Sequence, residues 1–204
     1  MSATSRKAIF FDRDGTLLDE LGYRSSPEGM QLLPGAAEAV RIAREAGFRA
    51  VLITNQSGVA RGYFDEADLA RVHERFEALL RAEGAALDGI FYCPHLPPET
   101  RSSDLERSGD QPHASPHRIV CACRKPAPGL YLEAARTLEL DLSQSVTIGD
   151  SLRDLEAAKR AGMDRLFLTA TGKGRDQHDA ANEAQRADYR FVADARAAVT
   201  LALG

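Results

Sequence analysis

Two carboxylates stand close together near the start of the chain. Asp12 and Asp14 lie in the sequence Asp-Arg-Asp-Gly-Thr, directly after the apolar residues 8–11. An aspartate can attack a phosphoryl group that Mg²⁺ has activated, and a covalent aspartyl-phosphate divides hydrolysis into two easier steps. A second carboxyl group can protonate the leaving oxygen and later deprotonate the attacking water. The pair therefore suits phosphoryl transfer, although such a pair also suits a turn and a helix cap.

Three later segments carry other groups that this chemistry needs. Thr54-Asn55 closes a second apolar run and offers a hydroxyl group and backbone N–H groups to a phosphoryl oxygen. Arg124-Lys125 supplies cations for an anionic transition state. Asp150 and Asp154 offer the oxygen ligands that Mg²⁺ takes. Each group alone also suits a local turn, a solvated charge or a helix cap.

All three cysteines lie in one segment, in the sequences Cys-Pro-His and Cys-Ala-Cys. Three thiols and one imidazole form the ligand set of a closed, structural zinc site. The alternative is three buried, unreactive thiols and a surface histidine. His113 and His117 are competing ligands, but the spacing of His95 from Cys93 matches that of the second pair. The predicted zinc ligands are Cys93, His95, Cys121 and Cys123. We expect this site to hold Arg124-Lys125 toward the phosphate.

Short apolar runs alternate with amphipathic stretches along the chain. The predicted strands are residues 8–11, 50–53, 90–92, 146–148, 166–168 and 189–192. Helices are predicted over residues 35–46, after the N-cap Asp65, and from the N-cap Ser151 to Gly162. This alternation predicts an α/β fold with a doubly wound, mostly parallel sheet.

Ligands of such sheets bind beyond the carboxyl ends of the strands. The polar segments 12–16, 54–57, 93–95 and 149–151 all follow predicted strands. We therefore expect a single site at this edge of the sheet.

The four motifs, in this order, resemble those of the haloacid dehalogenase superfamily of aspartate-nucleophile phosphatases, over residues 9–172. The resemblance implies that Asp12 is the nucleophile and Asp14 the general acid and base. It implies that Mg²⁺ is held by Asp12, the Asp14 carbonyl and Asp150, with Asp154 orienting a metal-bound water or Lys125. Thr54, Arg124 and Lys125 would stabilise the phosphoryl group. The implied fold is Rossmann-like, without a large cap domain.

Cys-Pro-His, Cys-x-Cys-Arg-Lys-Pro and residues 54–64 are similar to the D-glycero-D-manno-heptose 1,7-bisphosphate 7-phosphatases of bacterial heptose-nucleotide synthesis. That family implies hydrolysis of the C7 phosphate to give heptose 1-phosphate. The chain departs from the family at Ser151, where relatives can carry Lys, and in its long, Pro- and Ser-rich segment 96–120. The implied substrate contacts are Glu20, Leu21, Gly22, Tyr23, Thr54, Asn55, Gln56, Ser57, Arg124, Lys125 and Ser151.

Two other functions fit parts of the pattern. The histidinol-phosphate phosphatases resemble the same scaffold, zinc ligands included, but we expect an Asp there in place of Ser57. A non-enzymatic phospho-switch of the response-regulator type also uses Asp, Thr, Lys and Mg²⁺, but it has no counterpart of Asp14.

The composition narrows the class of protein further. With 204 residues, 44% of them hydrophobic and 27% charged, we expect a single domain over residues 1–204, with an inserted zinc-binding loop at 93–123. A net charge of −4 and the lack of a basic run argue against nucleic acid as a partner. Since no apolar run approaches the ~18 residues of a membrane span, we expect a cytoplasmic protein. The absence of an obvious apolar surface stripe favours a monomer, and the resemblance implies a small sugar phosphate as its partner.

Overall fold

The structure is a computed structural model that describes residues 6–20, 22–100 and 115–204. Three features considered in the sequence fall outside these residues: Leu21, His113 and much of the segment 96–120. Within the described part of the chain, no helix has the length and apolar character to cross a membrane.

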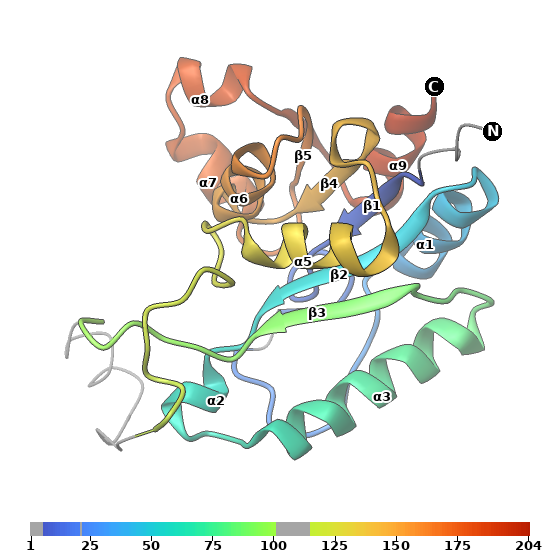
Figure 1. Ribbon diagram of the computed structural model, residues 1–204. Helices are drawn as coiled ribbons and strands as arrows, with labels where there is room; N and C mark the ends of the chain where they lie inside the picture. The colour runs from blue at the N-terminus through green and yellow to red at the C-terminus, as the bar shows by residue number, and fades with distance from the viewer. Residues whose placement is uncertain (1–5, 21, 101–114) are drawn as a thin grey trace.

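The described residues form one six-stranded sheet with helices on both faces (Figure 1). The strand order is β3-β2-β1-β4-β5-β6, and every neighbouring pair is parallel. The strands are β1 (Ala8–Phe11), β2 (Arg49–Asn55), β3 (Gly89–Cys93), β4 (Val146–Gly149), β5 (Arg165–Thr169) and β6 (Arg190–Val192). The predicted doubly wound sheet is therefore confirmed. The order reverses direction between β1 and β4, which is where ligands of this fold bind.

The predicted strands are all present, with ends shifted by at most two residues. β2 runs on to Asn55, so Thr54 and Asn55 close this strand rather than follow it, and β6 begins at Arg190 rather than at residue 189. The helices are α1 (Ala36–Glu45), α2 (Gly58–Arg61), α3 (Glu66–Ala82), α5 (Gly129–Leu138), α6 (Leu152–Arg160), α7 (Gly174–Ala180), α8 (Glu183–Ala187) and α9 (Ala195–Leu203). A short 3₁₀ helix, η1 (Leu142–Gln144), precedes β4.

Two of the predicted helix caps are confirmed. The Asp65 side chain accepts a hydrogen bond from Asp68 N at the start of α3. The Ser151 side chain accepts one from Arg153 N at the start of α6, while the Asp154 carboxylate accepts one from Ser151 N. The helix after Ser151 ends at Arg160, two residues before the predicted Gly162.

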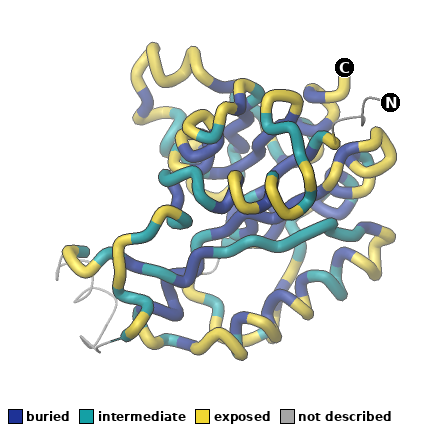
Figure 2. Tube along the Cα trace, viewed as in Figure 1, coloured by how far each residue is buried: buried dark blue, intermediate teal, exposed yellow. Residues whose placement is uncertain are grey.

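Both faces of the central strands are buried, as Figure 2 shows in dark blue. Ile9 and Phe11 of β1 pack with α1, α3 and α9, while Phe10 packs on the opposite face with α5 and α6. A strand that is buried on both faces reads as a continuous apolar run. This packing fixes the carboxyl ends of β1, β2 and β4 side by side, so the residues that follow them are held on a rigid base.

Candidate active site

A cavity of about 620 Å³ lies at the carboxyl edge of the sheet, a volume typical of small-molecule sites. It is lined by residues from β2, α6 and the loops that follow the strands. The cavity collects the candidate catalytic, Mg²⁺ and substrate residues that the structure describes. These are Asp12, Asp14, Glu20, Gly22, Tyr23, Thr54, Asn55, Gln56, Ser57, Arg124, Lys125, Asp150, Ser151 and Asp154.

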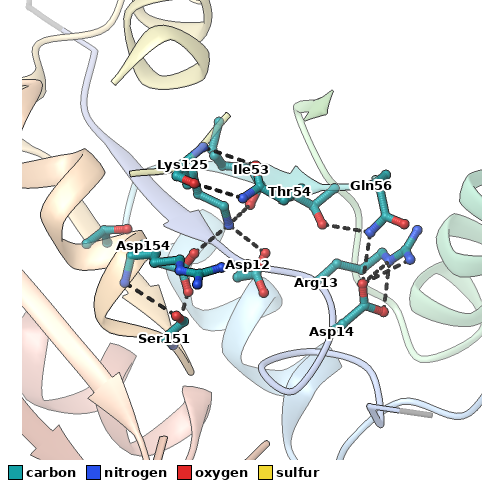
Figure 3. Close-up of polar contacts among 12 residues, drawn as sticks. Asp12, Arg13, Asp14, Ile53, Thr54, Gln56, Lys125, Ser151 and Asp154 are labelled. Atoms are coloured by element: carbon teal, nitrogen blue, oxygen red, sulfur yellow. Dashed lines mark hydrogen bonds and ion pairs between the residues drawn. The ribbon is translucent and has the colours of Figure 1, made fainter. Parts of the chain in front are cut away.

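Lys125 lies at the centre of the polar contacts in this cavity (Figure 3). Its Nζ donates to Asp12 Oδ1 at 2.7 Å and to the Ile53 carbonyl at 2.8 Å, and it pairs with Asp154 Oδ1 at 2.6 Å. Because an ammonium group has three N–H donors, each has one acceptor here. Burial opposes the charge of Lys125, but Asp12 and Asp154 raise its pKa above the ordinary value. Lys125 is therefore a fixed, permanently charged cation.

Three carboxylates gather around this one cation. Oxygen atoms of Asp12, Asp150 and Asp154 all lie within 4.8 Å of one another. Burial, together with nearby Asp154 and against the lowering effect of Lys125, raises the pKa of Asp12 to about 7. Burial, together with Asp12 and Asp154, raises the pKa of Asp150 to about 8. A buried surplus of carboxylate oxygens fits a hard cation such as Mg²⁺.

The contacts of Asp154 differ from those of the other two carboxylates. One of its oxygens pairs with Lys125, and the other accepts a hydrogen bond from Ser151 N at 3.1 Å. Asp150 accepts one hydrogen bond, from Lys173 N at 2.9 Å. Asp12 and Asp150 therefore keep oxygen atoms for a metal, while both oxygens of Asp154 are engaged.

Two glycines make room for the Asp150 carboxylate. Gly15 and Gly172 lie against it with φ angles of 79° and 53°, a region that side chains disfavour. A Cβ atom at either position would overlap Asp150 Oδ2. Both turns that surround this carboxylate therefore need glycine.

Asp14 faces a different set of partners from Asp12. Arg13 Nη2 lies 3.0 Å from Asp14 Oδ2, and Gln56 Nε2 donates to the same oxygen at 2.9 Å. The Gln56 amide also donates to Thr54 Oγ1 at 3.0 Å. Figure 3 shows Asp14 beside Arg13 and Gln56, whereas Asp12 points toward Lys125. The two carboxylates of the Asp-x-Asp pair thus sit in distinct environments, as two separate chemical roles require.

Asn55 holds the main chain of Lys125. Its Nδ2 donates to the Lys125 carbonyl at 3.1 Å, and its Oδ1 accepts from Lys125 N at 3.1 Å. This pair of hydrogen bonds ties the end of β2 to a residue 70 positions later in the chain. Asn55 therefore positions Lys125, a role that its sequence context did not indicate.

The four predicted zinc ligands also lie together. Cys123 Sγ is 3.2 Å from Cys93 Sγ and 3.3 Å from Cys121 Sγ, and His95 Nδ1 is 3.2 Å from Cys123 Sγ. Ligands of a tetrahedral zinc ion lie roughly 3.5–3.8 Å from one another. Burial raises the pKa of Cys93 and of Cys123, so a bound cation would offset the cost of their thiolate forms. The donor set fits zinc. His117 lies beside His95, with ring centroids 5.8 Å apart, and is outside the group of four.

Known proteins are similar to this chain over most of its length. Family models described as haloacid dehalogenase-like hydrolase and HAD-hydrolase-like match residues 9–73 and 122–198. A protein of Photorhabdus laumondii subsp. laumondii, named D-glycero-beta-D-manno-heptose-1,7-bisphosphate 7-phosphatase, is 39% identical over 81% of this chain and 81% of its own length. The protein of the same name from Escherichia coli K12 is 39% identical over 84% of this chain and 83% of its own length.

The chain belongs to the haloacid dehalogenase superfamily, in the family of heptose-bisphosphate phosphatases. A solved structure described as D,D-heptose 1,7-bisphosphate phosphatase from B. bronchiseptica, complexed with magnesium and phosphate, is 36% identical. It superposes with a TM-score of 0.77 over 97% of this chain and 98% of that one. The resemblance seen in the sequence is thus confirmed.

Four residues of this haloacid dehalogenase site were missed by sequence reasoning. Arg153, Lys173 and Gln177 line the cavity, and Lys173 forms an ion pair with Glu20. Arg13, almost fully buried, holds Asp14. Lys173 stands in the Thr-Gly-Lys segment 171–173, which is similar to the same family in sequence but by itself assigns no role to the lysine. The other three resemble ordinary surface residues in the sequence.

Proposed function

We propose that this protein is a Mg²⁺-dependent phosphatase that removes the C7 phosphate of D-glycero-D-manno-heptose 1,7-bisphosphate and leaves heptose 1-phosphate. The observation that carries the proposal is the placement of Asp12 between Lys125 and Asp150, in a chain 39% identical to relatives named for this reaction. Since those relatives are named for the β anomer, we expect this enzyme to prefer it.

The proposed Mg²⁺ ligands are Asp12, the backbone carbonyl of Asp14 and Asp150. Support comes from the closely spaced carboxylate oxygens of Asp12, which is partly buried, and Asp150, which is buried, and from their raised pKa values. When bound, the ion would neutralise charge on the phosphoryl oxygens. Asp154 would act through Lys125, since it pairs with Lys125 Nζ.

Asp12 is suited to be the nucleophile because Lys125 occupies only its Oδ1. The other oxygen would attack phosphorus, forming an aspartyl-phosphate as the bond to the C7 oxygen breaks. Asp14 would give that leaving oxygen a proton, and would then accept one from the water that attacks the aspartyl-phosphate. Lys125, Arg124 and the Thr54 hydroxyl would stabilise the phosphoryl oxygens throughout.

We further propose that Cys93, His95, Cys121 and Cys123 hold a structural zinc ion. With four protein ligands, no coordination position remains open for catalysis. The loop 93–123 would then be a zinc-binding insertion in a single domain of residues 1–204. We also expect a cytoplasmic, monomeric enzyme that takes a small-molecule substrate.

Steady-state kinetics on three substrates test the proposed reaction. The purified enzyme with Mg²⁺ is given the β and α anomers of heptose 1,7-bisphosphate and, separately, histidinol phosphate. We expect kcat/KM to be highest for the β anomer and at least tenfold lower for histidinol phosphate. Equal or faster turnover of histidinol phosphate would overturn the assignment.

The lifetime of the phosphorylated protein separates an enzyme from a phospho-switch. An enzyme of this kind releases phosphate from Asp12 within each turnover, with help from Asp14. An aspartyl-phosphate that survived for hours in the wild-type protein would contradict the phosphatase proposal.

A further inference from the structure

Four cationic side chains line the cavity, and two of them are already neutralised by carboxylates. Lys125 pairs with Asp12 and Asp154, and Lys173 pairs with Glu20. The other two cations are Arg124 and Arg153. Neither has a carboxylate partner among the residues that the structure describes. Arg124 and Arg153 are therefore the two cations of the cavity lining that no carboxylate of the described residues neutralises by direct contact.

Arg124 and Arg153 come from different parts of the fold and influence one another. Arg124 precedes Lys125 and donates through Nη1 to the His95 carbonyl at 3.1 Å, which leaves its other N–H groups for a ligand. Arg153, from α6, lines the same cavity as Arg124. Two like charges held near each other favour an anion between them.

The position of Arg153 in its helix is unfavourable for a purely structural residue. It is the second residue of α6, where the helix dipole opposes positive charge. The other basic residues of this helix have acidic partners, since Lys159 pairs with Asp188 and Arg160 with Glu156. Arg153 has no such partner in the described part of the chain, and it faces the cavity. A ligand anion would account for a cation placed there.

We propose that Arg153, beside Arg124, binds the phosphate that the enzyme does not remove, and that this contact makes the enzyme selective for bisphosphates over monophosphates. The inference rests on the proposed function. The hydrolysed phosphate is placed at Asp12 and Lys125, and Arg153 lines the same cavity, whose volume of about 620 Å³ is large enough for a sugar phosphate. A guanidinium group suits this task because its planar N–H donors match phosphate oxygens in pairs.

The test measures substrate selectivity rather than activity alone. Arg153→Gln, Arg153→Lys and the wild type are assayed on heptose 1,7-bisphosphate and on p-nitrophenyl phosphate, which has no second phosphate. We expect the ratio of kcat/KM for the bisphosphate to kcat/KM for p-nitrophenyl phosphate to fall about 10- to 100-fold in Arg153→Gln, mainly because KM for the bisphosphate rises. Arg153→Lys should recover part of this ratio. Lys159→Gln, on the same helix but paired with Asp188, removes the same charge and should keep the wild-type ratio.

The outcomes separate this inference from the proposed function. An unchanged ratio in Arg153→Gln would overturn the inference. An equal loss of kcat on both substrates would also overturn it, because a contact with the second phosphate acts only on the substrate that carries one. A wild-type enzyme that hydrolyses p-nitrophenyl phosphate but not heptose bisphosphate would instead overturn the proposed function.

Discussion

Replacing Lys125 by Met tests whether one ammonium group holds the carboxylates of the site together. Lys125 is 3% exposed, and its partners Asp12 and Asp154 are 12% and 4% exposed. Methionine keeps a flexible apolar side chain of similar length but removes the charge and three donors. Removing one partner of a buried ion pair costs about 3–5 kcal/mol. Since 1 kcal/mol shifts the Tm of a chain of this size by roughly 2–4 °C, we expect the Tm to fall by roughly 6–20 °C.

The loss of stability in Lys125→Met should depend on pH. In the folded protein the pKa of Asp12 is raised to about 7 and that of Asp150 to about 8, from the ordinary aspartate value of 3.8. Between the ordinary value and these raised values, the folded state still binds protons that the unfolded state has released. Folding stability therefore falls as the pH rises from about 4 toward 8. Without Lys125, which lowers the pKa of Asp12, this effect grows. The variant should therefore lose more stability at pH 8 than at pH 5.5.

Urea unfolding at both pH values, in buffer without added Mg²⁺, measures this difference directly. Lys159→Met is the matched control, because Lys159 pairs with Asp188 while remaining 54% exposed. An exposed ion pair contributes at most about 1 kcal/mol. If Lys125→Met stayed within about 1 kcal/mol of the wild type at pH 8, or lost equal stability at both pH values, the buried charge network described here would be wrong.

Three further predictions concern the acid and base, the zinc ligands and Mg²⁺. Asp14→Asn should lower turnover by about 100- to 10,000-fold, because the amide cannot transfer the proton. The circular dichroism spectrum should be preserved, because the side chain keeps nearly the same size. Unchanged turnover would refute the role of Asp14. Cys121→Ala should lower the zinc content, the activity and the Tm, because it loosens the segment that carries Lys125. A loss of about 2 kcal/mol would lower the Tm by roughly 4–8 °C. Wild-type protein that contained no zinc when purified without chelator would contradict the site. Calorimetry should show that Mg²⁺ affinity rises on the order of 100-fold from pH 6 to pH 8, because Asp12 and Asp150 release protons in this range, with pKa values of about 7 and about 8. A constant affinity would contradict their role as ligands.

The sequence predicted the strands well because each strand is short, apolar and bounded by polar residues or glycine. Its prediction of the helices was less complete. α5 begins at Gly129 after Pro126 and Pro128, residues that usually indicate a loop. α9 is rich in alanine, so the contrast between an apolar and a polar face is weak. Both helices are stabilised mainly by the sheet that they cover, which local sequence does not reveal.

The catalytic residue types could be predicted, but their supporting contacts could not. Asp12, Lys125 and Asp150 stand at strand ends or in motifs whose chemistry is specific. The contacts of Asn55 with Lys125, and of Gln56 with Asp14, join residues 70 and 42 positions apart. Nothing in a single sequence distinguishes an amide that binds substrate from one that holds another catalytic residue. The predicted substrate contacts of Asn55 and Gln56 therefore remain predictions, beside the positioning contacts that the structure adds.

The cysteine cluster is linked to both halves of the catalytic machinery. The Cys93 carbonyl accepts a hydrogen bond from Gln56 N at 2.7 Å, and the Gln56 side chain holds Asp14. On the other side, Cys123 lies two residues before Lys125, whose main chain is fixed by Asn55. The same group of four side chains therefore supports Asp14, the proposed acid and base, and Lys125, the cation that faces Asp12. Loosening the cluster should therefore disturb Asp14 and Lys125 together, and with them the proposed protonation of the leaving group and the proposed charge stabilisation.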